Sequence, residues 1–592
     1  MKLRDILSPF YVWKRTFQKP YTVRKPIEEH QAADRYRGFH TNNISKCIGC
    51  GTCSKICMNR TIDMVPVEGI ETTTKDSGLR PRFDYGRCCW CALCVDICPT
   101  GSLGMTNDYI WIETDADNFR YTPGIDRKKW DDNSKGYSKD PNLHLLCFEQ
   151  VPMPMEDADE GVKSFIEMVK GYSAEQANRE ADRCIQCGIC VATCPGHMDI
   201  PGYIKAVREN RLEDGLRIIY ETNPMPVVCG RVCTHQCEYV CALSAKGEPV
   251  AIRWLKRYVA DQIPSTEYQI ILNSKEAATG KEIAVIGSGP GGLSAAYYLA
   301  LMGHSITIYE RNPHAGGMLR YGIPEYRLPY DQLEKDIARI TELGVTILCN
   351  SEVGKDIPFQ KIYDTNDIVF FSTGLSKPYA IGVDGDEHPR VLSGLKVLDD
   401  VTRGITPELG TEVAVIGGGN VAIDAARTAR RLGANVTIYY RRREKDMPAD
   451  AEEIHDAKLD GVSMILKAIP LAIEERDNDS VTLVWGEAEM IDQGEGKRPK
   501  PVLKKDSRNE VAVSTVISAI GQEADYSFLP QKFIDKLTFE SGRVVTDENG
   551  RTADPKIFSG GDIANNVRDA ISAIADGHRA ARGIDLVLQS DN

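Results

Sequence analysis

The sequence KEIAVIGSGPGGLSAAYYLALMGHSITIYERN, residues 281–312, decides the fold of the carboxyl-terminal half of the chain. It sets out a short apolar strand, a glycine-rich turn, a helical pattern and a second strand that ends in an acid. Gly287, Gly289 and Gly292 allow a tight turn and a close approach of the backbone to a pyrophosphate at the amino terminus of the helix. Glu310 falls where an acid that binds a ribose hydroxyl is expected. The stretch therefore predicts a dinucleotide-binding Rossmann unit.

A second copy of this pattern, TEVAVIGGGNVAIDAARTARRLGANVTIYYRRRE, occupies residues 411–444. Its second strand runs into arginines where the first copy has an acid, and arginines can pair with the 2′-phosphate of NADP. The pattern favours NADP(H) over NAD(H), although three arginines in a row are also typical of a solvated face. The residues expected to bind this nucleotide are Gly417, Gly419, Asn420, Ala422, Arg441 and Arg442.

All but two of the 19 cysteines lie in closely spaced groups, and their odd total argues against a disulfide framework. The first two groups follow C-x2-C-x2-C-x3-C, a spacing in which three thiolates hold one cubane and the fourth holds the other. Zinc is the alternative, but zinc sites usually pair two separated C-x2-C knuckles. With Cys89 left spare, we expect one [4Fe-4S] cluster on Cys47, Cys50, Cys53 and Cys98, and a second on Cys57, Cys88, Cys91 and Cys94.

Two further groups provide eight more cysteines. The first repeats the same spacing, and the second recurs at every fourth residue, which would align its thiols along one stripe of a continuous helix. Sixteen well-spaced cysteines suit four [4Fe-4S] clusters. The isolated Cys147 and Cys349 are interpreted as buried small apolar side chains. The two groups are Cys184, Cys187, Cys190 and Cys194, and Cys229, Cys233, Cys237 and Cys241.

The composition indicates a folded protein of several domains. The chain has 592 residues, 42% hydrophobic and 27% charged, with a net charge of −13. This acidic balance argues against a nucleic-acid partner. No apolar run reaches the roughly 18 residues of a membrane span, and the first residues lack the pattern of a secretory signal. A cytoplasmic location is therefore expected.

From about residue 160 onward the chain resembles the small (β) subunit of glutamate synthase, the NADH-dependent ferredoxin:NADP transhydrogenase and the amino-terminal half of dihydropyrimidine dehydrogenase. This resemblance implies an FAD domain split by an inserted NAD(P) domain and preceded by a helical domain with two [4Fe-4S] clusters. The matching stretches are EADRCIQCGICVATCPGHMDIPGYI, NPMPVVCGRVCTHQCEYVC, AGGMLRYGIPEYRLP, YYRRREKDMPA and FSGGDIAN.

The same resemblance implies how the cofactors are held. FAD would be bound by the turn from Gly287 to Gly292, Glu310, Gly317, Leu319, Gly561 and Asp562, and the nicotinamide dinucleotide by the turn from Gly417 to Ala422 with Arg441 and Arg442. Family members often complete one cluster with Gln or Glu, where this chain has Lys256. Lysine is a poor iron ligand, so we expect Cys229 or another group to complete that cluster.

The first 120 residues resemble the two-cluster, ferredoxin-like subunit of respiratory complex I and membrane-bound hydrogenases, through RYRGFH, KCIGCGTCSKIC and RFDYGRCCWCALCVDICPTGSLGMT. Ahead of these motifs lies a basic segment whose apolar residues would fall on one face of a helix. We expect this segment to contact a protein partner, with the inner surface of a membrane as the alternative. The apolar residues are Leu3, Ile6, Leu7, Phe10, Trp13 and Phe17.

The expected fold is a multidomain α/β protein with six segments. They are an amino-terminal arm (1–40), a ferredoxin-like 2[4Fe-4S] domain (41–115), a linker strapped over the surface (116–160), a helical iron-sulfur domain (161–275), an FAD domain (276–390 and 516–592) and an NAD(P) domain (391–515).

The main functional hypothesis is an electron-transfer subunit of a hetero-oligomer. It would exchange hydride between NAD(P)H and FAD and pass single electrons through four clusters to or from a hydrogenase, a formate dehydrogenase or another ferredoxin-coupled enzyme. Hydride transfer itself requires no acid, base or nucleophile from the protein, so no catalytic residue is assigned. The alternatives are a glutamate synthase small subunit with an extra ferredoxin module, and a docking scaffold whose clusters are structural.

Overall fold

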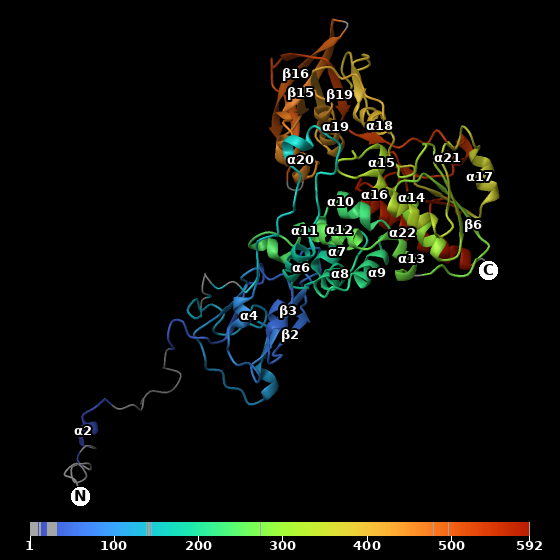
Figure 1. The fold of residues 1–592 in the computed structure, drawn as a ribbon. Helices are drawn as coiled ribbons and strands as arrows, with labels where there is room; N and C mark the ends of the chain where they lie inside the picture. Colours follow the sequence, from blue (N-terminus) through green and yellow to red (C-terminus); the bar gives the residue numbers. More distant parts are fainter. Residues whose placement is uncertain are drawn as a thin grey trace. The chain divides into compact units, whose positions relative to one another are not determined.

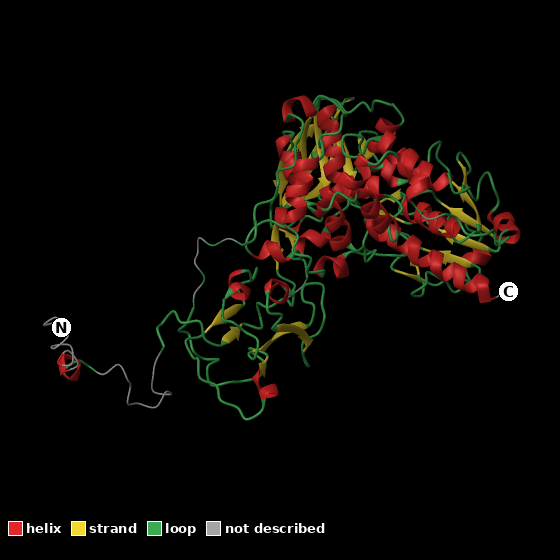
Figure 2. Cartoon of the chain, turned by 60° about the horizontal axis from the view of Figure 1, so that its bottom comes forward, coloured by secondary structure: helices red, strands yellow, loops and turns green. Residues whose placement is uncertain are grey.

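The computed structural model consists of two compact units, Met1–Cys147 and Phe148–Asn592. It describes residues 10, 13–19, 32–137, 139, 143, 145–272, 274–477, 479–494 and 497–590. Figure 1 follows the chain by colour from the first unit in blue to the Rossmann sheets in yellow and red, and Figure 2 shows helices on both faces of those sheets.

Two small antiparallel sheets form the core of the first unit, together with two short helices that carry cysteines. Strand β1 (His40–Asn42) pairs with β4 (Leu103–Met105), and β3 (Leu79–Asp84) pairs with both β2 (Ile62–Pro66) and β5 (Arg120–Tyr121). The helices α3 (Thr52–Ile56) and α4 (Leu93–Asp96) each follow a cysteine loop. Both begin after a residue in the left-handed region, Gly51 (φ 71°) and Ala92 (φ 68°). The two cysteine motifs therefore adopt the same loop-to-helix geometry.

The expected linker from 116 to 160 is not a surface strap along its whole length. Tyr121 and Trp130 are fully buried in the core of the first unit, where Trp130 stacks on Phe39 with ring centroids 4.2 Å apart. Aromatic side chains bury a large apolar area. This part of the segment, although polar in composition, therefore belongs to the core of the first unit. Beyond Cys147, the backbone N–H of Val151 donates to Glu180 (2.8 Å) in the second unit.

The described part of the amino-terminal arm contains the short helix α2 (Trp13–Thr16), and Phe10, Trp13 and Phe17 are exposed. Leu3, Ile6 and Leu7, which would complete the expected apolar face, lie outside the described residues. Among the helices that the structure describes, none is long and apolar enough to cross a membrane. Cys147 is exposed and Cys349 only half-buried, so interpreting both as buried side chains was wrong.

A cluster of helices opens the second unit. Helix α6 begins with a capping box between Ser173 and Gln176, and α8 begins at Asp199, which accepts from the Gly202 N–H. α10 packs against α12. The helices are α6 (Ala174–Asp182), α7 (Ile189–Thr193), α8 (Ile200–Arg208), α9 (Leu212–Tyr220), α10 (Pro226–Val232), α11 (Gln236–Tyr239), α12 (Ile252–Gln262) and α13 (Tyr268–Ile271).

The first Rossmann sheet is entirely parallel, with the order β23-β9-β6-β7-β8. Helices α14 (Pro290–Leu301) and α22 (Ala570–Ser590) pack on each other over it, so its last strand and last helix come from the end of the chain. The strands are β6 (Glu282–Ile286), β7 (Ser305–Tyr309), β8 (Thr346–Leu348), β9 (Ile368–Phe371) and β23 (Ile557–Ser559).

The second Rossmann sheet is also parallel, with the order β11-β19-β12-β13-β14. Strand β19 (Thr515–Ala519) pairs with β12, so the inserted unit continues to Ala519 rather than ending at residue 515. An antiparallel sheet of β15 (Ala468–Asp477), β16 (Ser480–Ile491), β17 (Lys500–Leu503) and β18 (Asn509–Val513) precedes β19. The other parallel strands are β11 (Val391–Ser393), β12 (Glu412–Gly417), β13 (Asn435–Tyr440) and β14 (Ser463–Leu466).

Candidate functional site

The main candidate site is a cavity of about 410 Å³ where three parts of the second unit meet. The FAD part contributes the first glycine turn, Glu310, Gly317, Leu319, Gly561 and Asp562. The inserted Rossmann part contributes Asn420 and Asp424, and the helical part contributes Val232 and Thr234. A ligand in this cavity would therefore touch both nucleotide-binding parts and the iron-sulfur part.

The first glycine turn is shaped for close backbone contacts. A Cβ on Gly292 would lie 2.1 Å from the Gly287 carbonyl oxygen, so this position holds the helix against the turn. Gly287 has φ 99°, and a Cβ on Gly317 would meet the Cα of Gly289 at 2.8 Å. A Cβ on Gly289, in contrast, would meet only the Ser372 carbonyl oxygen, at 4.0 Å. The protein itself leaves room at Gly289, as the close approach of a pyrophosphate requires.

Two acids, Glu310 and Asp562, lie in the cavity wall. Glu310 is buried and accepts hydrogen bonds from the Ser288 N–H (3.1 Å) and the Asn312 N–H (2.8 Å), which fix it beside the turn. Asp562 follows Gly561 (φ 82°), and its Oδ1 is buried without a hydrogen-bond partner among the described residues. Burial raises the pKa of Asp562 to about 6. An orphaned carboxylate oxygen in such a cavity fits a hydroxyl-bearing ligand, because a hydroxyl would satisfy it.

The eight cysteines of the helical part sort into two groups. Lys256 on α12 lies within charge-interaction range of the first, the Cys194 group, defined as Cys194, Cys229, Cys233 and Cys237. The second, the Cys184 group, is defined as Cys184, Cys187, Cys190 and Cys241. The expected stripe along one helix is wrong, because α10 ends at Val232 and Cys233 is extended (ψ 137°). Of this run, Cys229, Cys233 and Cys237 fall in the Cys194 group and Cys241 falls in the Cys184 group.

Lys256 is fully buried beside the Cys194 group. Although its burial opposes the charged form, the neighbouring cysteines raise the pKa of Lys256 above its ordinary value. The structure places Cys229 in the same group, and the expectation that Cys229 or another group completes this ligand set stays a prediction. A buried ammonium beside four thiolates compensates part of their negative charge.

The Cys194 group adjoins the large cavity. Cys233 lies between Val232 and Thr234, which both line the cavity, and the Thr234 hydroxyl donates to Asp569 (3.0 Å). This link between α11's loop and the start of α22 was not foreseen, because the two residues are 335 positions apart. Cys233, an expected cluster ligand, is therefore a direct sequence neighbour of two residues that line the cavity.

In the first unit, each expected ligand set lines its own small cavity. The Cys47 group, defined as Cys47, Cys50, Cys53 and Cys98, lines one cavity. The Cys57 group, defined as Cys57, Cys88, Cys91 and Cys94, lines the other, together with Cys89. Burial raises the pKa of the Cys53 and Cys94 thiols. These thiols would keep their protons unless iron displaced them, as ligation of a cluster does.

The second glycine turn is also shaped by close backbone contacts. Gly417 has φ 152°, and a Cβ there would lie 2.3 Å from the Ala519 carbonyl oxygen of β19. The three arginines after β13 differ in their surroundings. Arg442 Nε donates to the Pro499 carbonyl (3.0 Å) and Arg443 pairs with Asp446 (2.7 Å), whereas Arg441 is exposed. Arg441 is therefore the arginine most accessible to a nucleotide phosphate.

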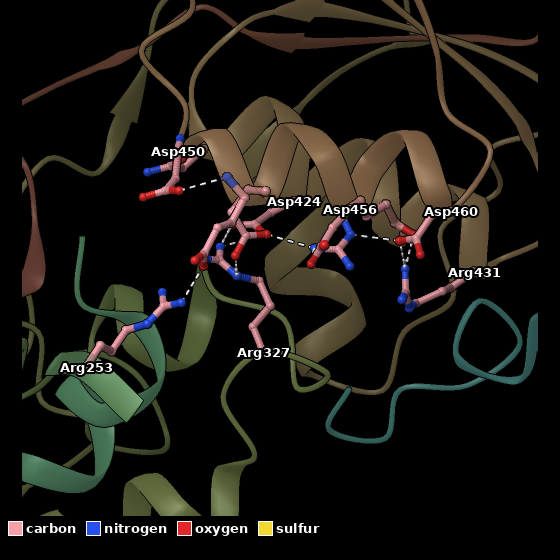
Figure 3. A network of polar contacts seen from close by, with 11 residues as sticks. Arg253, Arg327, Asp424, Arg431, Asp450, Asp456 and Asp460 are labelled. Carbon is pink, nitrogen blue, oxygen red and sulfur yellow. Dashed lines mark hydrogen bonds and ion pairs between the residues drawn. The ribbon is translucent and has the colours of Figure 1, made fainter. Parts of the chain in front are cut away.

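A buried network of ion pairs, shown in Figure 3, joins the three parts beside the cavity. Arg327 of the FAD part donates from Nη1 to both carboxylate oxygens of Asp424 on α19 (Asn420–Arg431), at 2.8 and 2.7 Å. Its Nε pairs with Glu453 on α20 (Ala451–Leu459) at 2.8 Å. Arg253 on α12 pairs with Glu452. The sequence motifs gave no signal for these contacts, which fix the inserted part against its neighbours.

Replacement of Arg327 by methionine is expected to lower the free energy of unfolding of the second unit by roughly 3–5 kcal/mol, because it leaves Asp424 buried without its partner. The measurement is a urea unfolding curve monitored by circular dichroism. The exposed pair Lys504–Glu487 (2.6 Å) provides the control, because Lys504→Met breaks an ion pair in solvent and should change little. Equal effects of the two substitutions would contradict a structural role for the network.

Comparison with known proteins agrees with this division into parts. Residues 281–577 match the pyridine nucleotide-disulphide oxidoreductase family, residues 161–268 match dihydropyrimidine dehydrogenase domain II with its 4Fe-4S cluster, and residues 46–102 match the 4Fe-4S dicluster domain. The expected family resemblance and multidomain α/β fold are thereby confirmed.

Three curated relatives cover different shares of the chain. The β subunit of the NADP(+)-dependent formate dehydrogenase of Moorella thermoacetica is 37% identical over 433 residues, 68% of this chain and 60% of that subunit. The small chain of the NADPH glutamate synthase of Escherichia coli is 32% identical over 446 residues, 71% of this chain and 93% of the relative. The E. coli oxidoreductase AegA is 29% identical over 575 residues, 92% of this chain and 86% of the relative.

The chain thus spans less than two thirds of the length of the formate dehydrogenase subunit but nearly all of the glutamate synthase small chain. Its family-defining region covers both Rossmann sheets and the cavity between them. The chain therefore belongs to the pyridine nucleotide-disulphide oxidoreductase family, among the iron-sulfur flavoproteins related to the small chain of glutamate synthase.

Proposed function

We propose that this chain is the nicotinamide-linked subunit of a larger redox complex, with FAD in the large cavity, NADP(H) on the second Rossmann sheet and four [4Fe-4S] clusters on the four cysteine groups. When bound, FAD supplies the exchange between a two-electron hydride and single electrons, and the clusters carry those electrons. The position of Cys233 between two residues of the cavity wall carries the proposal, because it puts a cluster ligand next to the flavin site.

The chain's own residues hold and orient the cofactors. The first glycine turn and Glu310 would bind the adenosine end of FAD, and Asp562 would accept from a hydroxyl near its other end. Arg327 and Asp424 hold the inserted part against the cavity, so a nicotinamide delivered by that part would face the flavin. Cys233 and its group provide the exit toward the Cys184 group, and the ferredoxin-like unit provides the port to a partner.

The partner we propose is a ferredoxin-coupled enzyme such as a formate dehydrogenase or a hydrogenase. The named relative from Moorella thermoacetica is a formate dehydrogenase subunit, which supports this choice. The reducing conditions that free cysteines require favour a cytoplasmic location for the complex. The exposed Phe10, Trp13 and Phe17 offer apolar side chains for contact with such a partner.

A second candidate is a glutamate synthase small subunit with an added ferredoxin-like module. The 93% coverage of the E. coli small chain supports it. The two candidates predict different companions, a metal-dependent oxidoreductase or a large amidotransferase. Anaerobic purification of the native complex, followed by mass spectrometry of its subunits, distinguishes them.

The test of the electron path uses the purified chain with its iron, sulfide and flavin contents measured. Under anaerobic conditions NADPH should bleach the flavin absorbance and then generate the electron paramagnetic resonance (EPR) signals of reduced [4Fe-4S] clusters. Flavin bleaching without any cluster signal, in protein that holds its full iron and sulfide, would refute the proposed path. Failure of both NADPH and NADH to bleach the flavin would refute the proposed function and favour the scaffold hypothesis.

Arg441→Glu is expected to lower kcat/KM for NADPH by roughly 10–100-fold, the worth of one charge-assisted hydrogen bond. The kcat/KM for NADH should stay level or rise, because NADH has no 2′-phosphate to be repelled. Steady-state kinetics with both nucleotides measures the ratio. Arg443→Gln is the matched control, because Arg443 is already paired with Asp446. Equal losses of kcat/KM with both nucleotides would show that Arg441 does not bind the 2′-phosphate of NADPH.

A further inference from the structure

A buried imidazole lies in the wall of the cavity formed by the Cys57 group. His40, the first residue of β1, is 1% exposed and lines that cavity. Its ring stacks on Phe83 with centroids 4.0 Å apart and an interplanar angle of 21°. Its Nε2 lies 3.3 Å from the Sγ of Cys94. His40 and Cys94 are 54 positions apart in the sequence, so no motif connects them.

The hydrogen bonds of Tyr85 decide which nitrogen of His40 carries the proton. The backbone N–H of His40 donates to the Tyr85 hydroxyl oxygen at 2.9 Å, and the same hydroxyl lies 3.0 Å from His40 Nδ1. A hydroxyl has one hydrogen to donate. If it donates to Nδ1, the Tyr85 hydroxyl and the His40 backbone N–H are both satisfied, and Nε2 must carry the ring proton. The Nε2–H then points at Cys94 Sγ.

The other tautomer leaves two groups unsatisfied. With the proton on Nδ1, the Tyr85 hydrogen would have no partner among the contacts of the described residues. The lone pair of Nε2 would face the electron-rich sulfur of Cys94. Both conditions are unfavourable in a buried site, where each unmade hydrogen bond costs about 1–3 kcal/mol. The network therefore selects the Nε2–H tautomer.

We propose that His40 tunes the reduction potential of the cluster on the Cys57 group by donating an N–H···S hydrogen bond to Cys94, with Tyr85 holding the tautomer. This inference rests on the proposed function, because it takes Cys94 as a cluster ligand. Reduction adds negative charge to the cluster and its sulfur ligands. A hydrogen bond to sulfur stabilises that charge and raises the reduction potential.

The contact differs from the other donors at this group. The Thr61 N–H (3.4 Å from Cys57 Sγ) and the Trp90 N–H (3.4 Å from Cys88 Sγ) belong to the same loops as the cysteines that they contact. These two hydrogen bonds are therefore part of the folded cysteine loops themselves. His40 comes from a separate strand, held by the pairing of β1 with β4. His40 is therefore a positioning residue whose hydrogen bond can be removed without altering a cysteine loop.

Two substitutions by amide side chains distinguish the hydrogen bond at Nε2 from the hydrogen bond at Nδ1. His40→Gln can place an N–H near the Nε2 position and keep the bond to sulfur. His40→Asn is shorter, can reach only the Nδ1 position and keeps the contact with Tyr85 alone. We expect His40→Asn to lower the ratio of reduced to oxidised cluster, at a fixed potential near the midpoint, by roughly tenfold, or about 59 mV for a one-electron couple. His40→Gln should stay near the native value.

The measurement is an EPR-monitored redox titration of the full-length protein, in which the cluster on the Cys47 group serves as an internal reference. Electron-nuclear double resonance adds a second readout, because the exchangeable Nε2 proton should couple to the reduced cluster in the native protein and in His40→Gln, but not in His40→Asn. An unchanged midpoint in His40→Asn, or equal shifts in both variants, would overturn the proposal.

Failure of this proposal can be distinguished from failure of the proposed function. Iron and sulfide contents of the native protein, with EPR signals from the amino-terminal unit, first establish that the Cys57 group holds a cluster. Native protein without such a cluster would refute the proposed function before any variant is compared. A native cluster whose potential ignores His40 would refute only the tuning role.

Discussion

Replacement of Cys233 by serine is expected to leave bleaching of the flavin by NADPH intact and to slow reduction of the iron-sulfur clusters by at least roughly 100-fold, because second-shell changes alone already cost 10–100-fold at metal sites. Cys233 belongs to the cysteine group that adjoins the flavin cavity, between Val232 and Thr234 in its wall. Loss of this ligand would interrupt the exit path at its first step, while the nucleotide-binding residues remain in place.

Anaerobic stopped-flow absorbance measures flavin bleaching in this variant, and freeze-quench EPR measures cluster reduction. Cys349→Ser is the matched control, because Cys349 is half-buried in the FAD part and outside all four cysteine groups. It should leave both rates unchanged. Cluster reduction at the native rate in Cys233→Ser would mean that electrons leave the flavin by another route, and the proposed order of cofactors would fall.

Two alanine substitutions in one glycine turn should have different effects. Gly292→Ala is expected to destabilise the FAD part by about 1–3 kcal/mol even without FAD, because its Cβ would lie 2.1 Å from the Gly287 carbonyl oxygen. Gly289→Ala should leave the stability of the FAD-free protein unchanged, since its nearest neighbour would be 4.0 Å away. It should nevertheless weaken FAD binding, because the Cβ occupies space that the pyrophosphate needs.

Thermal unfolding of FAD-free protein and fluorescence titration with FAD give the two quantities. Gly196→Ala, where a Cβ would make only ordinary contacts of 3.5 Å or more, controls for the substitution itself. If Gly289→Ala binds FAD as tightly as the native protein, the turn does not hold the pyrophosphate. If Gly292→Ala is fully stable, the turn relaxes more easily than its geometry indicates.

Local patterns predicted most of the fold, because the features that they describe are local. The glycine spacing of residues 287–292 predicted the first Rossmann unit, and the first three cysteines of each four-cysteine spacing in the first unit line one cavity together. Within each spacing, those three residues are placed by turns and short helices a few positions apart. Local geometry of this kind can be predicted directly from the spacing of residues in the sequence.

Long-range contacts could not be predicted in the same way. Trp130 lies in a polar stretch that looked like a linker, and only the tertiary structure shows that the side chain is buried against Phe39. The partners of Arg327 are 97 and 126 positions away, and His40 meets Cys94 across 54. Neither spacing nor periodicity encodes such pairs. The sites that join separate segments are therefore the ones that the sequence left open.

The discontinuous FAD part has a consequence for how the protein is made. Strand β23 and helix α22 complete its sheet and pack against α14, where the Ser294 hydroxyl donates to the Ile574 carbonyl (2.7 Å). During synthesis, β6 to β9 leave the ribosome long before β23 and α22. All sixteen grouped cysteines have emerged by residue 241, well before the flavin cavity can close. Iron-sulfur insertion can thus begin on the nascent chain before β23 and α22 are made, whereas the FAD cavity is complete only after they are.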